Sequence, residues 1–154
     1  MNGIALLAFI VLFLSFFGVL AYNQVAGSVA LSYAPPYYFV KDDWAGYANS
    51  FCFVLVFSLL FFGLGAPAAM AVEGLKYGVL FSTSVITMFD LAFIVPELFA
   101  MLAACTLGEG VMNDWSGKST IYANWSGGMR YILIGIVVLA ALVLVLHNPF
   151  ISSW

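Results

Sequence analysis

Charged residues are scarce in this chain of 154 residues. Only 7% of them are Asp, Glu, Lys or Arg, and four basic residues stand against seven acidic ones, which gives a formal net charge of -3. A nucleic-acid interface needs a basic patch, and a polybasic lipid anchor needs a cluster of Lys and Arg beside the membrane. The composition supplies neither, so we expect no nucleic-acid partner.

Cysteine and histidine, the residues that most often bind metals or form redox centres, are also scarce. Cys52 and Cys105 lie in apolar runs without a CxxC spacing, and we interpret both as small core residues. His147, the only histidine, ends the last apolar run, which is typical of an interfacial helix end. The chain contains no GxSxG, HExxH, P-loop or GxGxxG motif. We therefore expect no metal, no cofactor and no catalytic residue, and hence a protein that is not an enzyme.

Apolar residues dominate what remains, with 65% of the chain and a mean hydropathy of +1.11. They fall in blocks near the roughly 20 residues that cross a bilayer as a helix, whereas barrel strands would alternate over short segments. Residues 4–22, 51–72 and 131–146 are predicted spans. Residues 23–50, rich in Tyr, are predicted to lie along the membrane surface. The predicted fold class is all-α, a polytopic helical membrane bundle of four to five transmembrane segments in a single domain, residues 1–154.

The apolar block at about 78–112 permits two interpretations. Helices of about 74–95 and 96–112 could each cross the membrane, with Pro96 at the start of the second, where its missing N–H is harmless. Alternatively, the chain could enter the bilayer, break near residues 90–97 and return as a re-entrant hairpin. Each half would then hold about 12 residues, or ~18 Å of helix against a ~30 Å hydrocarbon core.

Two carboxylates inside that block form the candidate intramembrane polar site, which we assign to Asp90, Pro96 and Glu97. A carboxylate at bilayer depth is costly unless it faces protein, water or a partner. The site could be a discontinuous helix lining a polar cavity for a proton, cation or substrate. It could also be the tip of a full hairpin, with both carboxylates at the headgroups.

Small residues mark a candidate helix-packing site at Gly63, Gly65 and Ala66, beside Pro67. Small side chains let a neighbouring helix approach closely, and the proline predicts a kink within the span. Glu73 and Lys76 then follow as a short polar junction.

A pattern of Asx-Trp-small-Gly occurs three times, at residues 43–46, 114–117 and 124–127. Asx at the first position and Gly at the fourth suit a type I turn, and Trp suits the membrane interface. We predict a turn held at the headgroups in each place.

The distribution of basic residues predicts the orientation. Placing Lys76, Lys118 and Arg130 on one side leaves only Lys41 on the other, and basic residues favour the inside. The N-terminus is then predicted inside, and residues 107–130 are predicted to face the cytoplasm together with Lys76.

The order of these features resembles the stage II sporulation protein M family of bacteria and archaea. The resemblance lies in the Gly-containing junction at residues 73–78, in the Pro- and Glu-containing element at residues 93–104 that runs into Gly108, and in the last span closing at residues 150–151. It covers about residues 50–151. It implies a polytopic, non-catalytic membrane protein within a larger assembly, as in the complex that remodels the cell wall during sporulation.

The sequence therefore favours a non-enzymatic integral membrane subunit or scaffold in a larger membrane protein complex. Its expected partners are the lipid bilayer and other integral membrane subunits, or further copies of itself, and its expected location is the plasma membrane. The alternative is a small ion- or proton-coupled channel or transporter that uses Asp90 and Glu97 in a discontinuous helix.

Overall fold

The computed structural model describes residues 3–26, 44–82, 90–118 and 121–146, and every regular element in these ranges is helical. The elements are α1 (Gly3–Ala26), α2 (Trp44–Leu60), α3 (Ala66–Ser82), the short 3-10 helix η2 (Asp90–Phe93), α4 (Ile94–Trp115) and α5 (Ile121–Leu146). The predicted all-α helical bundle is confirmed. Lys41, His147 and most of the Tyr-rich loop lie outside the described residues.

Three of the helices are long and apolar enough to cross a membrane. They cover Gly3–Val25, Asp90–Trp115 and Ala123–Val145, and the apolar stretch Ala45–Leu60 of α2 is shorter. The 22 residues of α4 correspond to about 33 Å, close to the thickness of a hydrocarbon core. These helices indicate a membrane protein.

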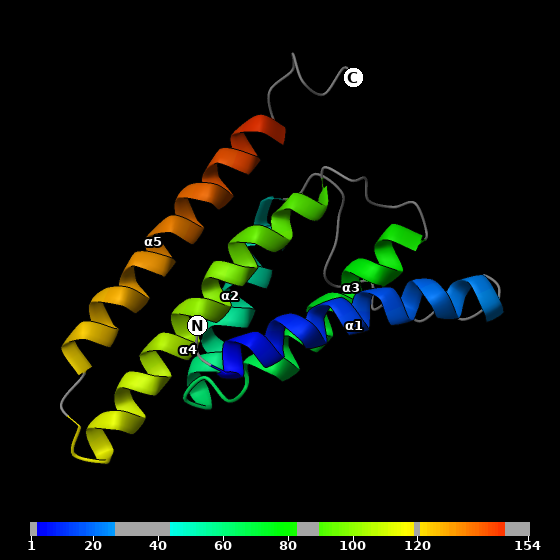
Figure 1. Cartoon of the computed structure of the whole chain (residues 1–154). Helices are drawn as coiled ribbons and strands as arrows, with labels where there is room; N and C mark the ends of the chain where they lie inside the picture. The colour runs from blue at the N-terminus through cyan, green and yellow to red at the C-terminus, as the bar shows by residue number, and fades with distance from the viewer. Residues whose placement is uncertain (1–2, 27–43, 83–89, 119–120, 147–154) are drawn as a thin grey trace.

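Helices α1 and α3 form a parallel pair, as do α2 and α4, whereas α4 and α5 form an antiparallel hairpin. Gly74 on α3 lies against Leu12 on α1, and Gly78 lies against Val19, so α1 and α3 run in the same direction. On α4 and α5, Gly128 meets Leu107, whereas the later Gly135 meets the earlier Phe99, so these two helices are antiparallel. Figure 1 shows the α1–α3 pair crossing the α4–α5 hairpin at an angle.

The second parallel pair is α2 and α4, and it connects the α1–α3 pair with the α4–α5 hairpin. Tyr47 near the start of α2 stacks on Phe93 just before α4, and Phe62 just after α2 lies against Trp115 at the end of α4. The buried core is built from apolar side chains of α1 to α4, among them Ala8, Phe51 and Met70. Its small members, such as Ala8, allow close approach between helices.

The predicted single span at residues 51–72 is wrong, because the chain ends one helix and starts another within it. Helix α2 ends at Leu60, and Phe62 and Gly63 take left-handed φ values of 52° and 85°. The N–H of Gly63 donates to the carbonyl of Ser58 at 2.8 Å, a bond that closes a helix C-terminus. Pro67 then occupies the first turn of α3, where its missing N–H is harmless.

The block at 78–112 follows the first interpretation more closely than the second. Helix α4 runs without a break from Ile94 to Trp115, with Pro96 in its first turn, so residues 90–97 are not the mid-depth break of two short halves. The helix before it is described as far as Ser82, and residues 83–89 lie outside the described residues. Residues 90–93 form η2 and not the end of an α-helix that runs to residue 95.

The three Asx-Trp-small-Gly segments have different outcomes. At 114–117 the predicted turn is confirmed: the N–H of Gly117 donates to the Asp114 carbonyl at 2.9 Å, and Gly117 has a φ of 77°. Residues 124–127 instead lie inside α5, so the turn predicted there is wrong. Of the segment at 43–46, Asp43 lies outside the described residues, and the other three residues form the start of α2.

Close contact between α1 and α3 predicts that Gly74→Ala destabilises the fold. An added Cβ at Gly74 would meet the Leu12 carbonyl oxygen at 2.5 Å and the Ser15 Cβ at 2.9 Å. We expect a loss of about 1–3 kcal/mol, as for other overpacked cores. Thermal unfolding of the purified protein in detergent measures it.

The matched control is Gly18→Ala on α1, where an added Cβ meets nothing within 4 Å. Alanine is the better helix former by up to about 1 kcal/mol, so this variant should be as stable as wild type or slightly more stable. Equal unfolding temperatures for the two variants would contradict the close approach of α1 and α3.

Candidate functional site

Lys76 on α3 is the centre of a polar network inside the bundle. Its ammonium forms an ion pair with Glu73 one turn earlier on the same helix, and its Nζ lies 3.6 Å from Oε1 of Glu97 on α4. It also donates a hydrogen bond of 2.7 Å to Oγ of Ser50 on α2. One cation therefore joins three helices and two carboxylates.

The spacing of residues on α3 explains why these groups share one face. Glu73, Lys76 and Tyr77 are three and four residues apart, which places them together on a helix. Gly74 and Gly78 form the neighbouring face and contact α1. Helix α3 thus has a polar face toward α2 and α4 and a small-residue face toward α1.

Glu97 is the most deeply buried acid of the network, with 1% of its surface exposed. Tyr77 donates its hydroxyl to Oε1 of Glu97 at 2.8 Å, whereas Oε2 of Glu97 has no hydrogen-bond partner among the described residues. The carboxylate lies in the first turn of α4, where the positive end of the helix dipole favours a negative charge.

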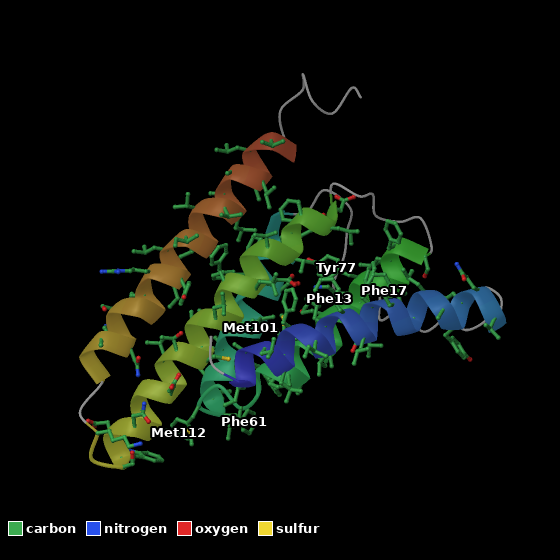
Figure 2. All side chains as sticks on the ribbon, in the orientation of Figure 1. Phe13, Phe17, Phe61, Tyr77, Met101 and Met112 are labelled. Atoms are coloured by element: carbon green, nitrogen blue, oxygen red, sulfur yellow. The ribbon has the colours of Figure 1, made fainter. Side chains whose placement is uncertain are left out.

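Tyr77 connects the cation to this acid. Its side chain is fully buried, it lies between α3 and α4 (Figure 2), and the Lys76 ammonium stands 4.6 Å from its ring centroid. A cation over an aromatic face is attracted by the ring quadrupole. The tyrosine therefore contacts Lys76 with its ring and Glu97 with its hydroxyl.

Asp90 lies in a neighbouring contact. It belongs to η2, is 4% exposed, and accepts a 3.2 Å hydrogen bond from the hydroxyl of Tyr47, whose ring stacks on Phe93 at 3.6 Å between centroids. Of the candidate polar site, Asp90, Pro96 and Glu97 are all buried near the start of α4. Glu97 receives its hydrogen bond from α3 and Asp90 receives its own from α2.

Sequence reasoning missed the partners of Glu97. Glu73 and Lys76 were predicted to form a polar junction between spans, but both lie in the middle of α3. Opposite charges one turn apart between apolar residues were the available signal, since such a pair can be buried as a unit. No local signal connects Lys76 with Glu97, because they lie on different helices.

The position of Lys76 also corrects the predicted grouping of basic residues. Lys76 pairs with the first turn of α4, whereas Lys118 follows its last residue, Trp115. The rise along α4 from Glu97 to Trp115 is 18 residues, or about 27 Å. Lys76 and Lys118 therefore cannot lie at the same membrane face if α4 crosses. The segment 107–130 is not one loop either, because most of it belongs to α4 and α5.

The candidate helix-packing residues lie at the turn between α2 and α3. An added Cβ at Gly63 would meet the Cys105 Cα of α4 at 3.0 Å, and one at Gly65 would meet the Phe57 carbonyl oxygen of α2 at 2.9 Å. Ala66 is fully buried.

Among the residues that the structure describes, no group of three His, Cys, Asp or Glu side chains could hold a metal ion. Both cysteines are free thiols; Cys105 is buried, but Cys52 is exposed on α2, so its predicted place in the core is wrong. Among the described residues, the polar network is the candidate site at which charged side chains from different helices meet.

No family model, curated protein or solved structure matches this chain. The resemblance to the stage II sporulation protein M family therefore stays a prediction.

The network predicts that Lys76→Met strongly destabilises the protein. Removing the cation leaves two buried carboxylates without their ion pair, and breaking a buried pair from one side costs about 3–5 kcal/mol. The double variant Lys76→Met with Glu73→Gln should recover part of that loss, since it also removes one of the stranded charges. Chemical denaturation in detergent compares the variants.

Lys118→Met is the control, because Lys118 is exposed after α4. It should unfold like wild type, since isolated surface charges contribute at most about 1 kcal/mol. If Lys76→Met were as stable as Lys118→Met, the buried network would not hold α3 in place.

Proposed function

We propose that this chain is a non-enzymatic, multi-pass subunit or scaffold of the plasma membrane, whose helices contact other integral membrane proteins in a larger complex. The observation that carries the proposal is the bare outer surface of the first and last helices. Only 17% of the spanning window of α1 and 11% of that of α5 are buried within this chain, against 56% for α4.

The outer surfaces of α1 and α5 are made of large apolar side chains. Leu6, Ile10, Leu14 and Phe17 on α1 are 45–67% exposed, and α5 likewise exposes Leu133, Val137 and Leu144. Lipid tails or partner helices can cover such surfaces equally well by hydrophobicity alone. Gly18 offers a place for close approach, since none of the described residues lies within 4 Å of its added Cβ.

The proposed orientation places the turn between α4 and α5 in the cytoplasm. Lys118 is exposed at that turn, and Arg130 is exposed in the first half of α5, nearer to the turn than to the other end of the helix. Both residues still favour a cytoplasmic turn by the positive-inside rule, although Lys76 no longer counts with them. With α4 and α5 antiparallel, the C-terminal end of α5 then lies outside.

Orientation is tested with Ser116→Cys, a position exposed at that turn. We expect a membrane-impermeant thiol reagent to label it in inverted vesicles and not in intact cells, because the turn faces the cytoplasm. Cys52→Ser as a common background removes the exposed native thiol. Labelling from outside, or a glycan on Asn124 in a glycosylating host, would reverse the orientation.

The subunit role is tested by site-specific crosslinking from matched leucines. A diazirine analogue of leucine at Leu14 or Leu133, which are 67% and 59% exposed, should crosslink to a distinct membrane protein or to a second copy of the chain. The same analogue at Leu12, which is 3% exposed against α3, should give no intermolecular product. Mass spectrometry of the adducts after crosslinking in native membranes reads the result.

Lipid adducts alone from both outward positions would contradict the subunit role.

A second candidate function, an ion- or proton-coupled channel or transporter, is favoured by one observation: two buried carboxylates share one ammonium. Proton or cation flux in reconstituted vesicles that Asp90→Asn or Glu97→Gln abolishes would support that function instead.

A further inference from the structure

Glu73, Lys76 and Glu97 carry one more negative than positive charge when all three are ionised. Each of the two acids is at most 3% exposed, and the lysine lies between them. An unbalanced charge in an apolar interior is costly, and it is removed when a group binds or releases a proton. The cluster therefore needs one further positive charge to be neutral.

The contacts within the cluster distinguish its two acids. Glu73 shares a helix with Lys76 and is in direct contact with its ammonium, whereas Glu97 Oε1 stands 3.6 Å away, beyond hydrogen-bond length. Both acids have an Oε2 without a hydrogen-bond partner among the described residues, but Oε2 of Glu73 is in the ion pair with Lys76, whereas Glu97 faces Lys76 with Oε1 and not with Oε2. A protonated carboxyl can keep accepting a hydrogen bond on one oxygen while the other carries the proton.

We propose that Glu97 is a proton-binding site, which takes a proton on Oε2 while Oε1 continues to accept the hydroxyl of Tyr77. With the proton bound, Glu73 and Lys76 form a neutral ion pair beside a neutral acid. With the proton released, Lys76 is shared between two carboxylates and the cluster carries a net charge of -1. This inference goes beyond the subunit role, and it holds whether or not the chain carries ions across the membrane.

The titratable and charged groups that face Glu97 come from the elements around the start of α4. Helix α3 contributes Glu73, Lys76 and Tyr77. Tyr47 of α2 and Asp90 of η2 are hydrogen-bonded to each other in the neighbouring contact. Helix α1 has no charged residue, and Arg130 of α5 is exposed on the stretch between Gly128, which meets Leu107, and Gly135, which meets Phe99. Lys76 is thus the cation that the described residues place beside this acid.

Proton binding has a mechanical consequence, because α3 and α4 touch at few other places. When Glu97 is ionised, Lys76 attracts it and ties the two helices together. When Glu97 is protonated, Lys76 pairs with Glu73 inside α3, and the hydrogen bond from Tyr77 remains as the polar link to α4. The proton therefore changes the electrostatic attraction between α3 and α4.

Infrared difference spectroscopy of the full chain in lipid vesicles tests this site directly. We expect wild type to show the C=O stretching band of a protonated carboxylic acid at neutral pH and to lose it on titration with base. Glu97→Gln should lack the band, whereas Glu109→Gln, which changes an exposed acid on the same helix, should keep it. Circular dichroism and gel filtration establish that each variant is folded.

Glu73→Gln provides a second variant should Glu97→Gln fail to fold. It leaves Lys76 with Glu97 alone, which favours the ionised form of Glu97, so the band should be lost at neutral pH. A band that survives in Glu97→Gln, the absence of any band in wild type, or a band unchanged in Glu73→Gln would overturn the proposal. Loss of the band on adding sodium at constant pH would overturn it in favour of a metal-cation site. Since the measurement involves neither partners nor flux, its failure leaves the crosslinking test of the subunit role independent.

Discussion

The ion pairs of Lys76 with carboxylates on two helices are the constraint on which the rest of the arrangement depends. A lysine and two glutamates cannot face lipid tails at low cost, so the face of α3 that carries them must turn toward other helices. Tyr77 and Ser50 supply hydrogen bonds there, and the first turn of α4 supplies the third charge. Once this face is committed to α2 and α4, the remaining faces of α3 have only α1 and lipid left to contact.

The glycines of the chain make that arrangement possible at short range. Gly74 and Gly78 let α1 lie directly on α3, and Gly128 lets α5 lie against Leu107 of α4. Gly63 has a different use, because its positive φ lets the chain end α2 and begin α3 within five residues. Small residues therefore serve close approach in the helices and reversal of the chain at the turn.

The charged side chains of the network are consequently buried inside the bundle, and the outer helices expose apolar side chains, as expected for a membrane protein. The inner surfaces of α2, α3 and α4 hold the buried charges, and the outer surfaces of α1 and α5 are apolar over most of their length. We propose that the exposed faces of α1 and α5 contact partners and that Glu97 binds a proton. The two proposals draw on different parts of the molecule, so each can hold without the other.

Local patterns in the sequence were enough to predict the bilayer environment, the all-α fold class and the positions of several helix ends. Long apolar runs require helices in a bilayer, Pro96 belongs in a first turn, and Gly117 ends α4, all because hydrophobicity and backbone preference act over a few residues. Only the tertiary structure decided that residues 51–72 form two helices, that α1 runs parallel to α3, and that Lys76 meets Glu97 rather than a headgroup. Those outcomes depend on which helix faces fit together and where buried charges find partners, and both are set by residues far apart in the chain.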